Sequence, residues 1–158
     1  MWLEQSLFFI QNSALARFLE TGREFTIAAQ IAHILGFTLL LALVLALTLR
    51  VQGWTLTALP LTRLSRALQR PYYLALTLAL GAGLLLFLPR ALAYGLKDIF
   101  AWKLLLLALA ILAQALLQGR LRALDEAAPA PAALKGLAFL SLFLWFGSAA
   151  AGRAIGFV

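Results

Sequence analysis

Long apolar stretches separated by short polar segments are the dominant pattern along the chain. A helix needs roughly 20 apolar residues to cross a bilayer. Four stretches come close to or exceed that length, at about residues 25–49, 71–88, 99–118 and 136–157. The pattern predicts an all-α integral membrane protein, in which residues 23–158 form a four-transmembrane-helix bundle.

Residues 1–22 have a different pattern, because polar residues interrupt the apolar ones within each turn. Trp2, Phe8 and Phe18 lie among charged and amide side chains, and Thr21-Gly22 ends the segment. This pattern is typical of an amphipathic helix in the plane of the membrane interface. We therefore expect an N-terminal interfacial helix over residues 1–22, on the outer face of the membrane.

The composition excludes several classes of protein. Of the 158 residues, 64% are hydrophobic and 12% are charged, whereas a soluble domain is about half apolar and a quarter charged. Soluble, disordered, collagen-like and nucleic-acid-binding proteins are therefore excluded, and the lipid bilayer is the expected partner. The chain has no cysteine and one histidine, so neither a disulfide nor a self-contained metal site is expected.

The charged loops predict the orientation in the membrane. Seven cations flank the first and third connections between spans, namely Arg50, Arg63, Arg66, Arg70, Arg120, Arg122 and Lys135. Four cations lie on the other side, namely Arg17, Arg23, Arg90 and Lys97. Because cytoplasmic loops carry an excess of Lys and Arg, we expect a multi-pass protein of the bacterial inner membrane with both termini on the periplasmic side.

The first cytoplasmic connection contains a basic stripe. Arg63, Arg66 and Arg70 share one helical face, opposite a row of leucines. We expect a separate amphipathic segment, beginning near Pro60, that contacts lipid of the inner leaflet through these arginines. The stripe is interpreted as a topology anchor or as a regulatory lipid sensor.

Ionisable residues within the spans are candidates for function because they are costly in lipid. His33 lies about 12 Å and Lys103 about 6 Å from the outer ends of their spans, at 1.5 Å per residue. Arg153 lies at a depth similar to that of Lys103, and Gln30 shares a helical face with His33. These four residues predict an outer-half cluster that binds a lipid, a quinone or a partner segment.

Two further interpretations of this cluster stay open. Lys103 and Arg153 are long enough to extend their charges to the outer head groups, with Glu24 and Asp98 as rim partners. The His33 side chain is too short to reach the head groups, and a hydrogen bond inside the bundle is the alternative to a ligand contact.

Small residues in the spans, among them Gly36, Gly81 and Gly83, predict close helix packing, and Gln114 predicts a hydrogen bond between helices.

The residues favour a protein with no catalytic activity of its own and identify no cofactor. The leading hypothesis is an integral subunit or partner-binding protein, associated with other membrane or periplasmic subunits or with copies of itself. The alternative is a redox anchor that binds quinone or haem b for a periplasmic electron-transfer protein. Haem b often takes two histidines, so it would need His33 from two protomers or one open axial position. A small-solute or anion pathway is the third hypothesis.

Four short motifs, in their order along the chain, resemble those of a protein family. They are His33-Ile-Leu-Gly36, Gly83-Leu-Leu-Leu-Phe87, Phe100-Ala-Trp-Lys103-Leu and Ala151-Gly-Arg153. The chain resembles an uncharacterised bacterial family of four-span inner-membrane proteins with H-x-L-G, F-x-x-K-L and A-G-R motifs. That family is distantly similar to the membrane domains of copper-resistance D-type proteins, which carry additional His and Met residues. The resemblance implies a four-helix fold and the residue set His33, Lys103 and Arg153, but no reaction.

Overall fold

The computed structural model describes residues 2–124 and 129–157, and all regular structure in these ranges is helical. Four long helices in the described ranges are apolar enough to cross a membrane. They are α3 (Arg23–Gln52), α4 (Leu61–Phe87, with the short helices that follow it), α6 (Asp98–Arg122) and α7 (Ala132–Ala154). The predicted all-α four-span bundle is confirmed, and the chain is a multi-pass membrane protein.

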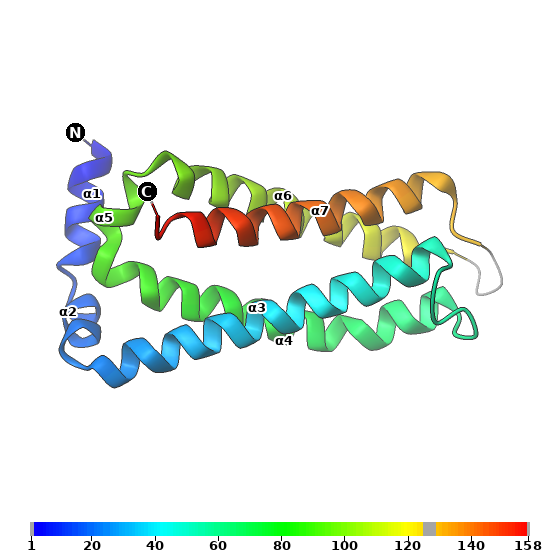
Figure 1. Cartoon of the computed structure of the whole chain (residues 1–158), viewed down its shortest axis with the longest axis horizontal. Coiled ribbons are helices and arrows are strands. Elements are labelled where there is room, and N and C mark those ends of the chain that lie inside the picture. The colour runs from blue at the N-terminus through cyan, green and yellow to red at the C-terminus, as the bar shows by residue number, and fades with distance from the viewer. Residues whose placement is uncertain (1, 125–128, 158) are drawn as a thin grey trace.

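The four spans form two antiparallel pairs. In Figure 1, α3 lies along α4 and α6 lies along α7, and the pairs touch through α3 with α7 and through α4 with α6. We call the end of the bundle where α3 begins and α7 finishes the terminal end. The opposite end, where α3 connects to α4 and α6 connects to α7, is the loop end. The two ends differ in how tightly the pairs are joined.

At the loop end, backbone geometry and hydrogen bonds hold the helices together. The α3 helix stops at Gly53, whose φ of 81° is in the left-handed region, which glycine adopts without steric cost. The Gln52 side-chain amide donates to the Lys135 carbonyl at 2.9 Å, and the Thr48 hydroxyl donates to the Ala138 carbonyl at 3.3 Å. Both bonds join α3 to α7, so the two pairs converge here.

The middle of the bundle is filled around one tryptophan. Trp145 is 0% exposed, and its ring packs edge-on against Phe37 and Tyr72 with centroid distances of 5.9 and 6.4 Å. Next to it, the Ser141 hydroxyl donates to Gln114 Oε1 at 2.7 Å and joins α7 to α6. The hydrogen bond between helices predicted for Gln114 is confirmed.

The N-terminal segment lies across the terminal end, roughly perpendicular to the spans (Figure 1). It consists of two helices rather than one, α1 (Trp2–Gln11) and α2 (Ala14–Thr21). The break is at Ser13, whose hydroxyl accepts a hydrogen bond from the Ala16 N–H at 3.3 Å, as N-cap residues do. The segment is helical as predicted and leaves its large aromatic side chains exposed, namely Trp2, Phe8, Phe9 and Phe18.

The second span starts earlier than the predicted residue 71. The α4 helix begins at Leu61 and contains Pro71, so the basic segment is the first part of this span rather than a separate helix. Leu61 is buried in the loop-end core, and this packing stabilises helix before the proline, which lacks an N–H. The three arginines of the basic stripe are exposed. The α6 helix continues past the predicted residue 118 to Arg122. The α7 helix begins at Ala132, before the predicted residue 136, and ends at Ala154, before the predicted residue 157.

A compact connection joins α4 to α6 at the terminal end. It contains a 3-10 turn, η1 (Leu88–Arg90), and the short helix α5 (Ala91–Gly95), which the sequence pattern did not predict. Gln11 of α1 accepts a hydrogen bond from the Leu92 N–H at 3.0 Å through its Oε1 atom. The connection is thereby fixed to the N-terminal helices and positions Arg90 and Tyr94 at this end of the bundle.

Candidate ligand-binding cavity

The position of His33 depends on a close approach of α3 to α4 at Gly36. A Cβ atom on Gly36 would lie 2.8 Å from the backbone nitrogen of Ala79 and 3.1 Å from the carbonyl oxygen of Ala75. Only a glycine fits at such a distance, because any side chain would contact backbone. One turn earlier on the same face, His33 Nδ1 lies 2.7 Å from the Ala79 carbonyl oxygen. Gly36 therefore places the imidazole within hydrogen-bond reach of the neighbouring helix.

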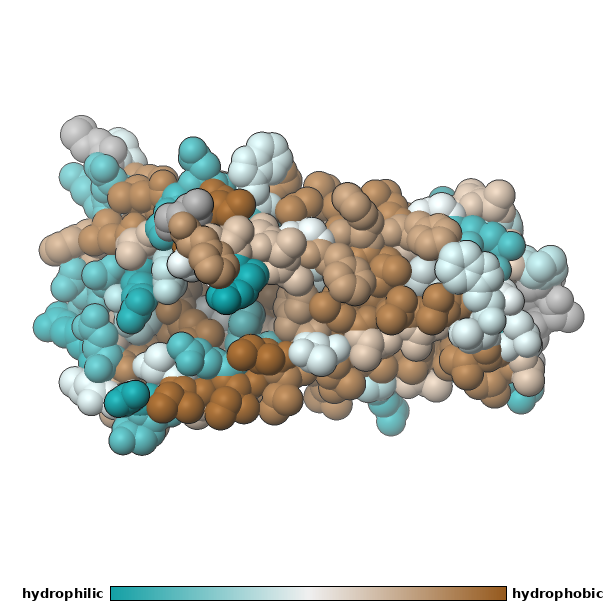
Figure 2. Space-filling model, viewed as in Figure 1, coloured by the Kyte–Doolittle hydropathy of each residue, from teal (hydrophilic) through white to brown (hydrophobic). Residues whose placement is uncertain are grey.

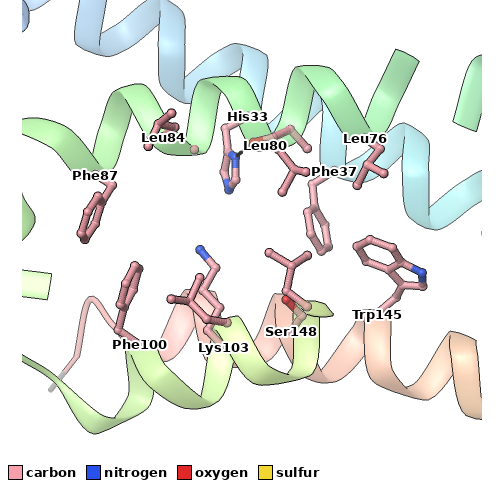
Figure 3. Close-up of a pocket in the computed structure, with 14 residues that line it drawn as sticks. His33, Phe37, Leu76, Leu80, Leu84, Phe87, Phe100, Lys103, Trp145 and Ser148 are labelled. Carbon is pink, nitrogen blue, oxygen red and sulfur yellow. Dashed lines mark hydrogen bonds between the residues drawn. The ribbon is translucent and has the colours of Figure 1, made fainter. Parts of the chain in front are cut away.

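This hydrogen bond determines how the imidazole faces the interior. A carbonyl oxygen can only accept, so Nδ1 carries the proton and donates it to Ala79. In the neutral ring, Nε2 then keeps a lone pair. Figure 3 shows this nitrogen pointing away from α4 toward α6. Gly83 leaves room for the imidazole ring because it has no side chain. A Cβ atom at this position would lie only 3.0 Å from Cε1 of His33.

Lys103 approaches the same space from the opposite helix pair. Figure 3 shows its side chain extending from α6 toward His33, with the ammonium group between the two helix pairs. Its stem passes over Gly152 of α7, where a Cβ atom would lie 3.3 Å from Cε and 3.5 Å from Nζ. The side chain is half-buried. The structure therefore brings the imidazole of the first span and the ammonium of the third span to one internal space.

Two adjoining chambers meet at these two side chains. The apolar chamber has a volume of about 340 Å³ and extends toward Trp145, between Phe37 of α3 and Leu107 of α6. The polar chamber has a volume of about 330 Å³ and lies nearer the terminal end. Five residues line both chambers, namely His33, Gly83, Phe87, Phe100 and Lys103. The cavity is therefore apolar on one side of the His33 and Lys103 side chains and polar on the other.

Each chamber has a different opening. The rim of the apolar chamber includes Leu80, Leu84 and Leu104, which are 41%, 57% and 47% exposed. These leucines lie on α4 and α6, so this chamber opens sideways toward lipid. Figure 2 shows polar side chains gathered at the terminal end around a hollow between α3 and α7, where exposed Gln30 and Arg153 line the polar chamber.

A stacked aromatic pair lies where the two chambers meet. The rings of Phe87 and Phe100 are 5.0 Å apart between centroids and 4° from parallel. Phe87 ends α4 and Phe100 belongs to the first turn of α6, so the pair bridges the two helix pairs across the cavity, as Figure 3 shows. The stacking keeps the two helices in contact on this side of the terminal end.

All four residues predicted from the sequence line the polar chamber, namely Gln30, His33, Lys103 and Arg153. The predicted rim partners Glu24 and Asp98 are exposed, and neither lines either chamber. The arginines of the basic stripe begin α4 at the loop end, away from this site. The structure thus brings together the polar residues of three spans and leaves the two carboxylates outside.

The sequence pattern missed several lining residues. Arg90 was interpreted only as a cation of a connection, and Tyr94 had no signal beyond that of an aromatic residue near a span end. The turn that brings both residues to the chamber was not predicted. Ser148 is 1% exposed and lines the apolar chamber without a hydrogen-bond partner for its hydroxyl among the described residues. In the sequence, a serine four residues before a glycine within a span indicates close helix packing rather than a cavity. Phe87 and Phe100 did carry a signal, because Phe87 ends and Phe100 begins a motif quoted above for the resemblance.

Comparison with protein-family models, with curated proteins and with solved structures gives no match for this chain. The geometry of the cavity is therefore the basis for proposing a function.

Proposed function

We propose that this protein is a non-catalytic integral subunit of the bacterial inner membrane that binds an amphiphile, a lipid or a quinone, between its two helix pairs. The observation that supports this proposal is the pairing of an apolar and a polar chamber at His33 and Lys103. Each chamber is in the size range of small-molecule sites, about 300–1,000 Å³. An amphiphile would place its tail in the apolar chamber and its head in the polar one.

The opening between α4 and α6 supports entry of such a ligand from the membrane. The leucines at this rim are exposed on the surface that faces acyl chains. A tail that moves from lipid into the chamber exchanges one apolar environment for another, so no exposed apolar surface has to form. The specificity of binding would then come from the polar groups at the head.

The redox-anchor alternative uses the same cavity. His33 directs Nε2 into a chamber lined by aromatic rings, which suits a quinone ring. Haem b with two imidazole ligands would need a second protomer, since the chain contains one histidine. Identification of the molecule that copurifies with the protein separates a lipid from a quinone, and a Soret band would indicate haem.

Gly83→Leu should remove the bound molecule. The new side chain would start 3.0 Å from the His33 ring and fill the space where the chambers meet. Overpacking costs about 1–3 kcal/mol, so retention of the copurified molecule should fall roughly tenfold. The measurement is native mass spectrometry of the purified protein, followed by extraction and identification.

Gly81→Leu is the matched control for this substitution. Gly81 lies two residues away on the same helix, and a Cβ atom there meets nothing within 4 Å. This variant should retain the molecule as the wild type does. Equal retention by Gly83→Leu, Gly81→Leu and the wild type would rule out this cavity as the binding site.

We also propose that the terminal end faces the periplasm, from the excess of cations at the loop end. The chain has no cysteine, so single cysteines can report the orientation. With a membrane-impermeant maleimide applied to cells with a permeabilised outer membrane, Gln5→Cys should be labelled and Thr57→Cys should not. Both positions are exposed, one in α1 and one in the connection after α3. The reverse labelling pattern would overturn the orientation.

A further inference from the structure

The polar chamber has a strong positive charge. Arg90, Lys103 and Arg153 line it, and they come from three different elements, η1, α6 and α7. No aspartate or glutamate is among the described residues that line either chamber. Glu20 lines an adjoining cleft together with Arg90, outside the space that contains Lys103 and His33. The chamber thus contains three cations and no aspartate or glutamate among its described lining residues.

The position of Lys103 makes this imbalance costly. Lys103 is a half-buried residue within a membrane span, and its ammonium group points to the interior of the bundle (Figure 3). Charged groups inside a membrane protein normally pair with an opposite charge, because desolvation is unfavourable. An anionic ligand would supply that charge, whereas a neutral quinone would not.

The C-terminal turn is held so that its charge stays at the chamber. The Lys97 ammonium donates to the Ile155 carbonyl at 3.2 Å, which fixes the end of α7 to the connection before α6. The Arg153 guanidinium lies 4.6 Å from the centroid of the Phe157 ring. This contact orients the guanidinium and leaves its N–H groups available for acceptors. Gln30 and Tyr94 add neutral polar groups to the same chamber.

We propose that the amphiphile is an anionic phospholipid, whose phosphate is bound by Lys103, Arg90 and Arg153 while an acyl chain occupies the apolar chamber. This inference rests on the proposed function and names its ligand class. A phosphodiester shares one negative charge between two terminal oxygens, which match the guanidinium groups in bidentate geometry and the ammonium as a point charge. The charge selects the head group, and the apolar chamber distinguishes a lipid from free phosphate.

The test uses the full-length protein in nanodiscs of phosphatidylcholine and phosphatidylglycerol with identical acyl chains. Native mass spectrometry after release from the disc measures which lipid stays bound. The wild type should retain phosphatidylglycerol in preference to phosphatidylcholine. Lys103→Met and Arg153→Gln should each reduce this preference by about tenfold, the size expected for a lost charge-assisted hydrogen bond. Arg90→Gln should act in the same direction.

Arg122→Gln is the control, because it removes the same charge from the opposite end of α6, the helix that carries Lys103. It should leave the preference unchanged, which separates binding in the chamber from general attraction of anionic lipid. Thermal unfolding in detergent checks that each variant is folded. Arg153 is exposed, so Arg153→Gln should disturb the folded structure less than Lys103→Met.

Four results would overturn the proposal. These are equal retention of both lipids by the wild type, an unchanged preference in Lys103→Met and Arg153→Gln, displacement of phosphatidylglycerol by excess inorganic phosphate, and retention of an added neutral quinone instead. The test of Gly83→Leu stays separate. If that variant loses its ligand while the charge variants keep theirs, the amphiphile site stands and the anionic head group is wrong.

Discussion

Gly36→Ala should destabilise the folded bundle by about 1–3 kcal/mol, the cost of overpacking a close contact. The added Cβ atom would lie 2.8 Å from the backbone nitrogen of Ala79, and backbone cannot move aside as a flexible side chain can. In an open helix the same change is favourable by about 1 kcal/mol. The sign of the effect therefore reports directly on the contact between α3 and α4. Thermal or denaturant unfolding in detergent measures it.

Gly81→Ala provides the comparison for this prediction. Because its Cβ atom would meet nothing within 4 Å, alanine should leave the stability unchanged or raise it by up to about 1 kcal/mol. If Gly36→Ala is as stable as Gly81→Ala, the two helices do not approach each other as closely as described.

The same substitution should also disturb His33. Its hydrogen bond to Ala79 lies one turn from Gly36 on the same face, so separation of the helices should break it. The chain contains one histidine, and nitrogen NMR of labelled imidazole therefore shows a single residue. We expect the Nδ1-protonated ring in the wild type and a mixture of tautomers in Gly36→Ala. An unchanged spectrum would mean that Gly36 does not position the imidazole.

Trp145→Ala should cause the largest loss of stability, about 3–5 kcal/mol, as for other buried tryptophans cut to alanine. The side chain is 0% exposed and contacts Phe37 and Tyr72, so its removal leaves a void that joins the apolar chamber. Trp145→Phe should recover part of the loss because it keeps an aromatic ring. Unfolding in detergent measures the difference.

Trp102→Ala is the matched change for Trp145→Ala. Trp102 is 60% exposed, and surface substitutions usually change stability by less than about 0.5 kcal/mol. Equal destabilisation by the two variants would show that burial inside this bundle does not determine the contribution of a tryptophan.

The arrangement of the pairs explains why the cavity between them lies near the terminal end. Hydrogen bonds from Thr48 and Gln52 join α3 to α7 at the loop end, and leucines of α3 and α6 fill the interior there. At the terminal end the pairs are joined through η1, α5 and the stacked pair of Phe87 and Phe100. The space between these two closures is bordered by His33 and Lys103.

Part of the candidate site could be predicted from single residues. His33 and Lys103 stand out in apolar spans because an ionisable group in lipid is costly wherever the helix packs, and depth along each span placed them at similar heights. Arg90 could not be recognised in this way. It follows Pro89 in a connection where a cation is unremarkable, and it reaches the chamber because η1 and α5 fold over the terminal end.

The sequence by itself determined that lipid surrounds this protein, that four helices cross it, and which polar residues interrupt them. Hydropathy and helix length are local properties, since every backbone group in lipid must be satisfied within its own helix. Only the tertiary structure decided that α4 begins before Pro71, that Gly36 rather than Gly81 forms the close contact, and that carboxylates are left outside the cavity. These features depend on which helix faces meet, and packing between helices with similar apolar surfaces is not encoded in hydropathy.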